Sequence, residues 1–524
     1  MTDNASPAEP ETKSNPLQRG EIAADAPVTK REIRIVYAGF MVVMALAALD
    51  QSVVTTALPR IVSDLGGVAY LSWVVTAYVL ASTSVMPLYG KLSDQYGRKP
   101  LIYTAVLIFL LGSLLSAMST SMTQLVAFRI VQGLGAGGLM PLSQIIIGDL
   151  VSPRERGRYQ GAIGMVYIVA TLGGPALGGI ITDALSWHWI FLINLPIGVA
   201  ALIMIAITLR RRHKVTIRSI DYAGAALLAL ATCGLLLTLG LGGRTWPWLS
   251  AQLLALAAAT LVCTALFVWR EFRAPEPIMP MSLFRNPVFT IAIVVTALTF
   301  MSSQGASVYF PLFFQVVYGV KMSNSGWLTA PLMMGVVIAA RVNGRVVVRT
   351  GRYKKMQIVG CCLAISGFSG LTFCAATGQA IWLIEICIVA VGFSMGLVNP
   401  NMVVAVQNAV DPRNLGAATA GTTFFRSLGG VTGVAASGAI LTSRLAEQFA
   451  TATLPDGVNG PEMMNGGIVQ ILALPPAAYE AVVDIYRSAI ASAFGLGIVM
   501  TSIALLVALR LPELPLRSKA GGGA

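Results

Sequence analysis

The chemistry of this 524-residue sequence is expected at three of the ionisable residues that lie inside its long apolar stretches. They are Asp50, Arg129 and Glu385. Acids in such surroundings are rare and usually functional, because an ionised carboxylate is costly there. A carboxyl group that is neutral in one state and charged in another can bind and release a proton, so Asp50 is the first candidate for a proton carrier.

Each of these residues also has a structural interpretation. Asp50 can be a neutral core residue that is hydrogen-bonded to a neighbouring hydroxyl group. Arg129 stays charged and needs a partner or water, which helix packing could also supply. Gln132 shares its helical face and could line a cavity. Two interpretations of Glu385 are equally supported. It could form a second proton or cation site, or its side chain could extend to the outer membrane interface.

Apolar helices must hold these residues. The chain is 56% hydrophobic and 11% charged, with a mean hydropathy of +0.74. Soluble proteins carry about 25% charged residues, so a water-soluble domain is excluded. The apolar stretches are continuous rather than alternating, which excludes a β-barrel. At about 20 residues for each crossing, fourteen stretches are long enough, which predicts an all-α integral membrane protein in a lipid bilayer.

Basic residues indicate the orientation. The chain has 36 Lys and Arg against 23 Asp and Glu, a net charge of +13. Most of the basic residues fall in the tails and in alternate loops, such as 91–99, 154–158, 210–218 and 345–355. This bias predicts an even number of crossings in the cell membrane with both termini cytoplasmic. The charge therefore reports topology and predicts no nucleic-acid partner, and two His and six apolar-segment Cys predict no metal site.

The chain divides into helical groups. The expected parts are a disordered cytoplasmic tail at 1–35, a six-helix bundle at 36–209, two accessory helices at 222–269, a second six-helix bundle at 288–510 with an external loop at about 443–488, and a cytoplasmic tail at 511–524. Paired halves are common in secondary transporters.

A weak internal repeat supports this division. Gly90–Lys99 and Gly344–Lys354 share a glycine, a basic residue and a Gly-Arg pair after the second helix of each half. Val348 stands in the second copy where the first has Asp94, so a weaker contact is expected there.

Five motifs carry a resemblance to a known family. The loop Gly90–Lys99 resembles the signature of the major facilitator superfamily. Four other segments are similar to motifs of its fourteen-helix drug:proton antiporters, the EmrB/QacA-like branch: Leu49–Pro59, Arg129–Gly135, Gly173–Gly179 and Trp189–Gly198. The resemblance covers the chain outside its tails. It implies two six-helix bundles, two additional central helices and a cavity at the midplane.

The resemblance also implies roles for individual residues. Asp50 would carry the proton, and Arg129 would modulate its protonation. A cytoplasmic gate is implied for Gly90, Asp94, Gly97 and Arg98, in which the acid and the arginine are spaced to pair or to cap a helix. An antiporter hinge is implied for Gly174, Pro175, Gly178 and Gly179, where small residues let helices approach closely.

Polar and aromatic residues on the spans are candidates for the substrate cavity: Tyr78, Gln132, Gln304, Tyr309, Phe310, Gln315 and Asn399. Aromatic and Met-rich walls suit varied apolar ligands. No phosphate-binding glycine loop follows a strand, which predicts no nucleotide and no cofactor. The energy source is then an ion gradient.

The expected function is proton-coupled export of small hydrophobic, often cationic compounds by alternating access, without enzymatic activity. A dedicated exporter of one metabolite, siderophore or lipid would share these motifs. A uniporter would keep transport after neutralisation of Asp50. A membrane enzyme or sensor would need a catalytic cluster or a soluble signalling domain, and the sequence offers neither. The architecture implies a monomer.

Overall fold

The computed structural model describes residues 30–67, 70–208, 219–243, 245–320, 327–452, 471 and 474–516. This part of the chain is almost entirely helical. Within it, thirteen helices are long and apolar enough to cross a membrane. A further helix of 32 residues, α6 (Pro153–Ala184), packs beside them against α2 and α15. The predicted all-α fold is confirmed.

The helices form two groups and a connecting pair. The first bundle contains α2 (Lys30–Leu65), α3 (Leu71–Tyr96), α4 (Arg98–Ala117), α5 (Met122–Leu150), α6, α7 (Trp189–Leu192) and α8 (Asn194–Thr208). The accessory pair is α9 (Tyr222–Leu241) and α10 (Ala251–Glu271). After the short α11 (Ser282–Arg285), the second bundle contains α12 (Pro287–Ser307), α13 (Phe310–Tyr318), α15 (Ala330–Thr350), α16 (Lys354–Thr377), α17 (Ile381–Ala409), α18 (Leu415–Thr451) and α21 (Pro476–Leu509).

Each bundle has its own apolar core. Phe40 and Phe109 are fully buried in the first bundle. Phe310, Phe368 and Phe494 are fully buried in the second. Burial of such large apolar side chains within each group makes the bundles separate packing units.

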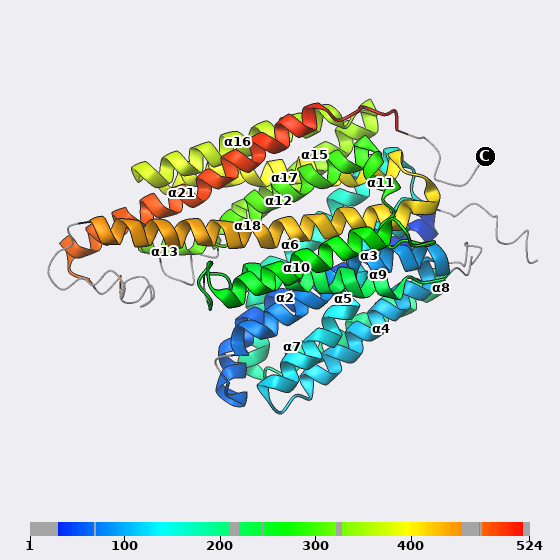
Figure 1. Ribbon diagram of the computed structural model, residues 1–524, viewed down its shortest axis with the longest axis horizontal. Coiled ribbons are helices and arrows are strands. Elements are labelled where there is room, and N and C mark those ends of the chain that lie inside the picture. The colour runs from blue at the N-terminus through cyan, green and yellow to red at the C-terminus, as the bar shows by residue number, and fades with distance from the viewer. Residues whose placement is uncertain are drawn as a thin grey trace, which may run out of the picture.

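The two bundles meet along α3 with α18 and along α6 with α15. We call the end where α3 finishes and α18 begins the latch end. Away from it, toward α7 and α13, the two groups of helices spread apart (Figure 1). The accessory helix α9 packs against both α3 and α18, so it touches both bundles.

Several helices extend beyond the apolar stretches predicted from sequence. α2 begins at Lys30, and α18 and α21 reach into the segment expected as an external loop at 443–488. Hydropathy detects only the part of a helix that crosses lipid, whereas hydrogen-bonded turns continue into water. Residues 1–29 of the predicted tail, and 453–470 and 472–473 of the loop, lie outside the described residues.

Candidate functional site

Asp50 and Arg129 form an ion pair inside the first bundle. Asp50 lies in the middle of α2 and Arg129 on α5, and both are 1% exposed. Nη1 of Arg129 lies 2.6 Å from Oδ2 of Asp50. The arginine also donates from Nε to the Val74 carbonyl at 3.3 Å, and the Tyr78 ring lies 4.1 Å from its guanidinium carbon. The permanent charge of Arg129 is thus compensated within the protein.

The Asp50 carboxylate accepts two further hydrogen bonds. Nε2 of Gln132 donates to its Oδ1 at 2.8 Å, and Nδ2 of Asn194 donates to the same oxygen at 2.9 Å. Charge-assisted hydrogen bonds of this kind are shorter and stronger than those between neutral groups. Asn194 belongs to the Trp189–Gly198 motif, but sequence reasoning gave it no role. A polar Asn inside an apolar segment, two residues before Pro196, was the available signal.

Small residues of α6 let α2 come close to it. The Ser52 hydroxyl donates to the Ala170 carbonyl at 3.1 Å. A Cβ on Gly174 would overlap the Ser52 side chain, and one on Gly178 would collide with Oγ1 of Thr56. Close backbone approach between membrane helices requires this absence of side chains.

The other residues expected in the hinge differ from these two. Gly173 and Gly179 have open space at the Cβ position. The side chain of Pro175 lies outside the described residues. The structure therefore brings Gly174 and Gly178, but not Gly179, against α2.

This difference predicts a matched pair of stability effects. Gly174→Ala should destabilise the protein by about 1–3 kcal/mol, because overpacking moves α2 away from α6. Gly173→Ala should be neutral or stabilising by up to about 1 kcal/mol, because Ala favours the helix. Thermal unfolding of both purified variants measures the difference. Equal unfolding midpoints would contradict the proposed close packing.

At the latch end, Asp94 joins the two bundles. Its Oδ1 and Oδ2 accept the backbone N–H groups of Gly416 and Ala417, each at 2.9 Å. These groups lie in the first turn of α18, where the helix dipole favours a negative charge. Nη1 of Arg98 lies 2.5 Å from Oδ1 of Asp94, and its Nε lies 2.9 Å from Oδ2 of Asp149.

Glycine is required in this motif at two positions. A Cβ on Gly90 would overlap that of Ala420 and lie 2.6 Å from the Gly416 carbonyl oxygen. Gly97 has φ +90°, a left-handed backbone that glycine adopts without steric cost. Gly90 and Asp94 thus contact the second bundle directly, whereas Arg98 pairs with Asp94 and Gly97 forms the turn between α3 and α4.

Other residues of the latch end were missed by sequence reasoning. Asp149 ends α5 beside Arg98, and Lys91 pairs at 2.7 Å with Glu276 in the segment after α10. Nε2 of Gln407 donates to the Gln144 carbonyl at 3.2 Å, which also joins the bundles. The basic loops indicated that acidic residues would pair with them, but the sequence did not indicate which acidic residues lie within reach.

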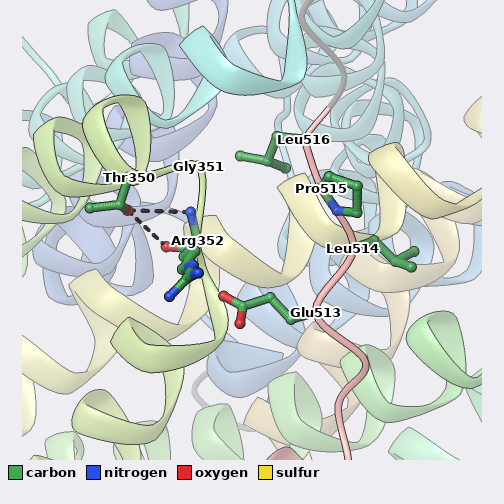
Figure 2. Close-up of a pocket in the computed structure, with 7 residues that line it drawn as sticks. All are labelled: Thr350, Gly351, Arg352, Glu513, Leu514, Pro515 and Leu516. Atoms are coloured by element: carbon green, nitrogen blue, oxygen red, sulfur yellow. Dashed lines mark hydrogen bonds between the residues drawn. The ribbon is translucent and has the colours of Figure 1, made fainter.

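The second copy of the loop makes a different contact. Tyr353 is fully buried, and its hydroxyl donates to the Pro512 carbonyl at 3.1 Å. Burial raises the pKa of Tyr353 above its usual value. A pocket of about 410 Å³ separates Thr350–Arg352 from residues 513–516 (Figure 2). Residues 511–516 of the predicted tail therefore pack against the second bundle, whereas 517–524 lie outside the described residues.

Most of the candidates for the substrate cavity lie inside the bundles. Five of them are buried: Tyr78, Gln132, Tyr309, Phe310 and Gln315. Tyr78 and Gln132 contact Arg129, whereas Phe310 packs in the core of the second bundle. Gln304 and Asn399 are half-buried, on α12 and α17. Aromatic residues at helical spacing mark the interior of a bundle as readily as a ligand cavity, because both surfaces are largely apolar.

Glu385 lies on α17, in the bundle opposite Asp50. Both of its carboxylate oxygens are buried without a hydrogen-bond partner among the described residues. The structure therefore does not bring the two acids together. Among the described residues, no group of three or more His, Cys, Asp or Glu is arranged to hold a metal ion.

Comparison with known proteins adds to this geometry. A sequence profile of the Major Facilitator Superfamily matches residues 40–434. The multidrug transporter protein MdtP of Bacillus subtilis (strain 168) is 37% identical over 406 residues, which cover 78% of this chain and 75% of the relative. Multidrug resistance protein 3 of the same organism is 32% identical over 449 residues, 86% of each chain. The solved proton:xylose symporter XylE shares the fold, with a TM-score of 0.59 at 14% identity, over 92% of this chain and 96% of that one.

Proposed function

This chain belongs to the major facilitator superfamily, and we propose that it exports small hydrophobic, often cationic compounds in exchange for protons by alternating access. The buried pair of Asp50 and Arg129 is the observation that carries this proposal. The names of the two Bacillus subtilis relatives, both multidrug proteins, support the substrate class. We expect the protein to act as a monomer in the lipid bilayer, without a cofactor, a nucleotide or a nucleic-acid partner.

Protonation of Asp50 provides the coupling step. While the carboxylate is ionised, it compensates the permanent charge of Arg129. A neutral Asp50 leaves the arginine without a counter-ion in a buried site, which favours a rearrangement of the helices that hold the pair. One proton moved across 100 mV supplies about 2.3 kcal/mol, and one unit of pH difference adds about 1.4 kcal/mol.

The latch end controls access to the transporter from one side of the membrane. We assign it to the cytoplasmic side of the cell membrane, because the basic residues concentrate in its loops. Contacts of Asp94 with the start of α18 then hold the cytoplasmic side closed. Opening toward the cytoplasm requires these hydrogen bonds to break. The termini are expected on the same side.

Substrate-triggered proton movement tests the proposal. Inverted membrane vesicles that contain the protein receive ethidium, and a pH-sensitive dye reports the protons. We expect a response from the parent and at least a tenfold smaller one from Asp50→Asn, because removal of the carboxyl group abolishes the coupling step.

The remaining outcomes separate the alternatives. Equal responses from parent and variant would contradict the role of Asp50 and make Glu385 the next candidate. Ethidium export that persists without proton movement would indicate a uniporter. A parent that responds to none of a panel of cationic dyes would contradict multidrug export and favour a dedicated exporter of one compound.

A further inference from the structure

Asn194 occupies a break in the sixth membrane crossing. It is the first residue of α8, directly after Ile193 interrupts the helix, and its side chain is fully buried. Its Nδ2 donates to Oδ1 of Asp50 and to Oγ of Ser113, each at 2.9 Å. The Ser113 hydroxyl donates to the Phe191 carbonyl at 2.9 Å, so its oxygen is an acceptor toward Asn194. Both N–H bonds of the amide are therefore in use.

The carbonyl of the same amide, in contrast, forms no hydrogen bond among the described residues. Its oxygen, Oδ1 of Asn194, is buried. Gln132 donates to the same oxygen of Asp50, but its own carbonyl accepts from Nη1 of Arg129 at 2.8 Å. A buried polar atom without a partner is uncommon and needs an explanation. Of the two amides on this carboxylate, only Asn194 has a carbonyl oxygen that receives no hydrogen bond among the described residues.

A protonated Asp50 needs such an acceptor. Its new O–H group would point at the N–H groups that now donate to Oδ1, and two donors cannot form a hydrogen bond. Around this group, α5 contributes the charged Arg129 and α3 the titratable Tyr78, which lies on the guanidinium. Helices α4 and α8 contribute the neutral Ser113 and Asn194. A half-turn of the Asn194 amide would place its carbonyl at the O–H group.

We propose that Asn194 is a positioning residue that reverses its side-chain amide when Asp50 takes up a proton from water. The inference rests on the proton exchange proposed above. Reversal gives the carbonyl a donor in the Asp50 O–H group, and it breaks both hydrogen bonds that Nδ2 now donates, to Asp50 and to Ser113. The Ser113 hydroxyl can then turn from the Phe191 carbonyl to Asn194. Protonation of Asp50 on α2 thereby changes the hydrogen bonds of Ser113 on α4 and of the junction between α7 and α8.

Infrared difference spectroscopy of the full-length protein in liposomes tests this reversal. The sample is labelled with ¹³C at the side-chain carbonyl of asparagine, and the pH is lowered stepwise. We expect an asparagine carbonyl band to move to lower wavenumber, because the carbonyl gains a hydrogen bond. The shift should follow the same pH dependence as the carboxyl band that appears when Asp50 is protonated. Asp50→Asn should abolish both changes.

The chain offers a matched control in Gln132, which donates to the same oxygen of Asp50. Because Arg129 already holds its carbonyl, a glutamine-labelled sample should show no comparable shift. Asn194→Leu should remove the titrating asparagine band and reduce ethidium-driven proton movement about tenfold. Asn194→Ser serves the same purpose if the leucine variant does not fold.

The possible failures can be told apart. If the Asp50 carboxyl band titrates while asparagine stays unchanged, the role of Asn194 is overturned and proton exchange stands. If the asparagine band persists in both Asn194 variants, it belongs to another residue and the inference is wrong. If Asp50 shows no titrating band at all, the proposed proton site fails together with this inference.

Discussion

Replacement of Asp50 by Asn is expected to destabilise the protein more than replacement of Arg129 by Gln. Loss of one partner of a buried ion pair costs about 3–5 kcal/mol, because an uncompensated charge remains. In Asp50→Asn that charge belongs to an arginine, which cannot lose its proton. In Arg129→Gln it belongs to a carboxylate, which can become neutral by taking up a proton.

The pH dependence separates the two variants. The thermal unfolding midpoint of Arg129→Gln should rise as the pH falls, because protonation removes the unpaired charge of Asp50. Asp50→Asn has no carboxylate at this site, so its deficit should persist at every pH. The double variant Asp50→Asn/Arg129→Gln contains neither charge and should regain most of the lost stability. Differential scanning fluorimetry of the four purified proteins measures these midpoints. A double variant less stable than Asp50→Asn would contradict the pairing.

The fold followed from the sequence because lipid imposes a simple length rule. An apolar stretch of about 20 residues must be a helix that crosses the membrane, which located the elements without knowledge of their partners. The same rule gives no information on helix ends in water. Hydropathy therefore did not reveal that α18 continues to Thr451, into a segment that was predicted to be a loop.

The candidate site was predicted in part. Asp50 and Arg129 were expected together from the resemblance, and the structure places them 2.6 Å apart. Asn194 and Asp149 were not expected, because their contacts depend on the rotation of each helix about its axis. An apolar membrane helix gives little information on that rotation, since most of its faces are apolar. For the same reason, Phe310 was predicted to line the substrate cavity, whereas in the structure it packs in the core of the second bundle.

Asp94→Asn is expected to open the latch end. The carboxylate accepts two N–H groups of α18 and one from Arg98, and the asparagine side chain retains only one acceptor oxygen. Hydrogen bonds to charged groups contribute about 1.5–3 kcal/mol each. A net loss of about 2 kcal/mol would change the ratio of closed to open molecules about 30-fold. Spin labels at Glu155→Cys on α6 and Lys355→Cys on α16 report this change as a longer distance across the latch end.

A second acid at this end separates the latch from a general loss of charge. Asp411 accepts the backbone N–H of Arg413 at 2.8 Å, entirely within the second bundle. Asp411→Asn removes one negative charge, as Asp94→Asn does, but breaks no contact between the bundles. We expect its spin-label distances to match those of the parent. If both variants open the latch end equally, the charge of the loops and not the cap on α18 holds the bundles together. If neither opens it, the close backbone approach of Gly90 to Gly416 is sufficient for closure, and Asp94 is not the latch.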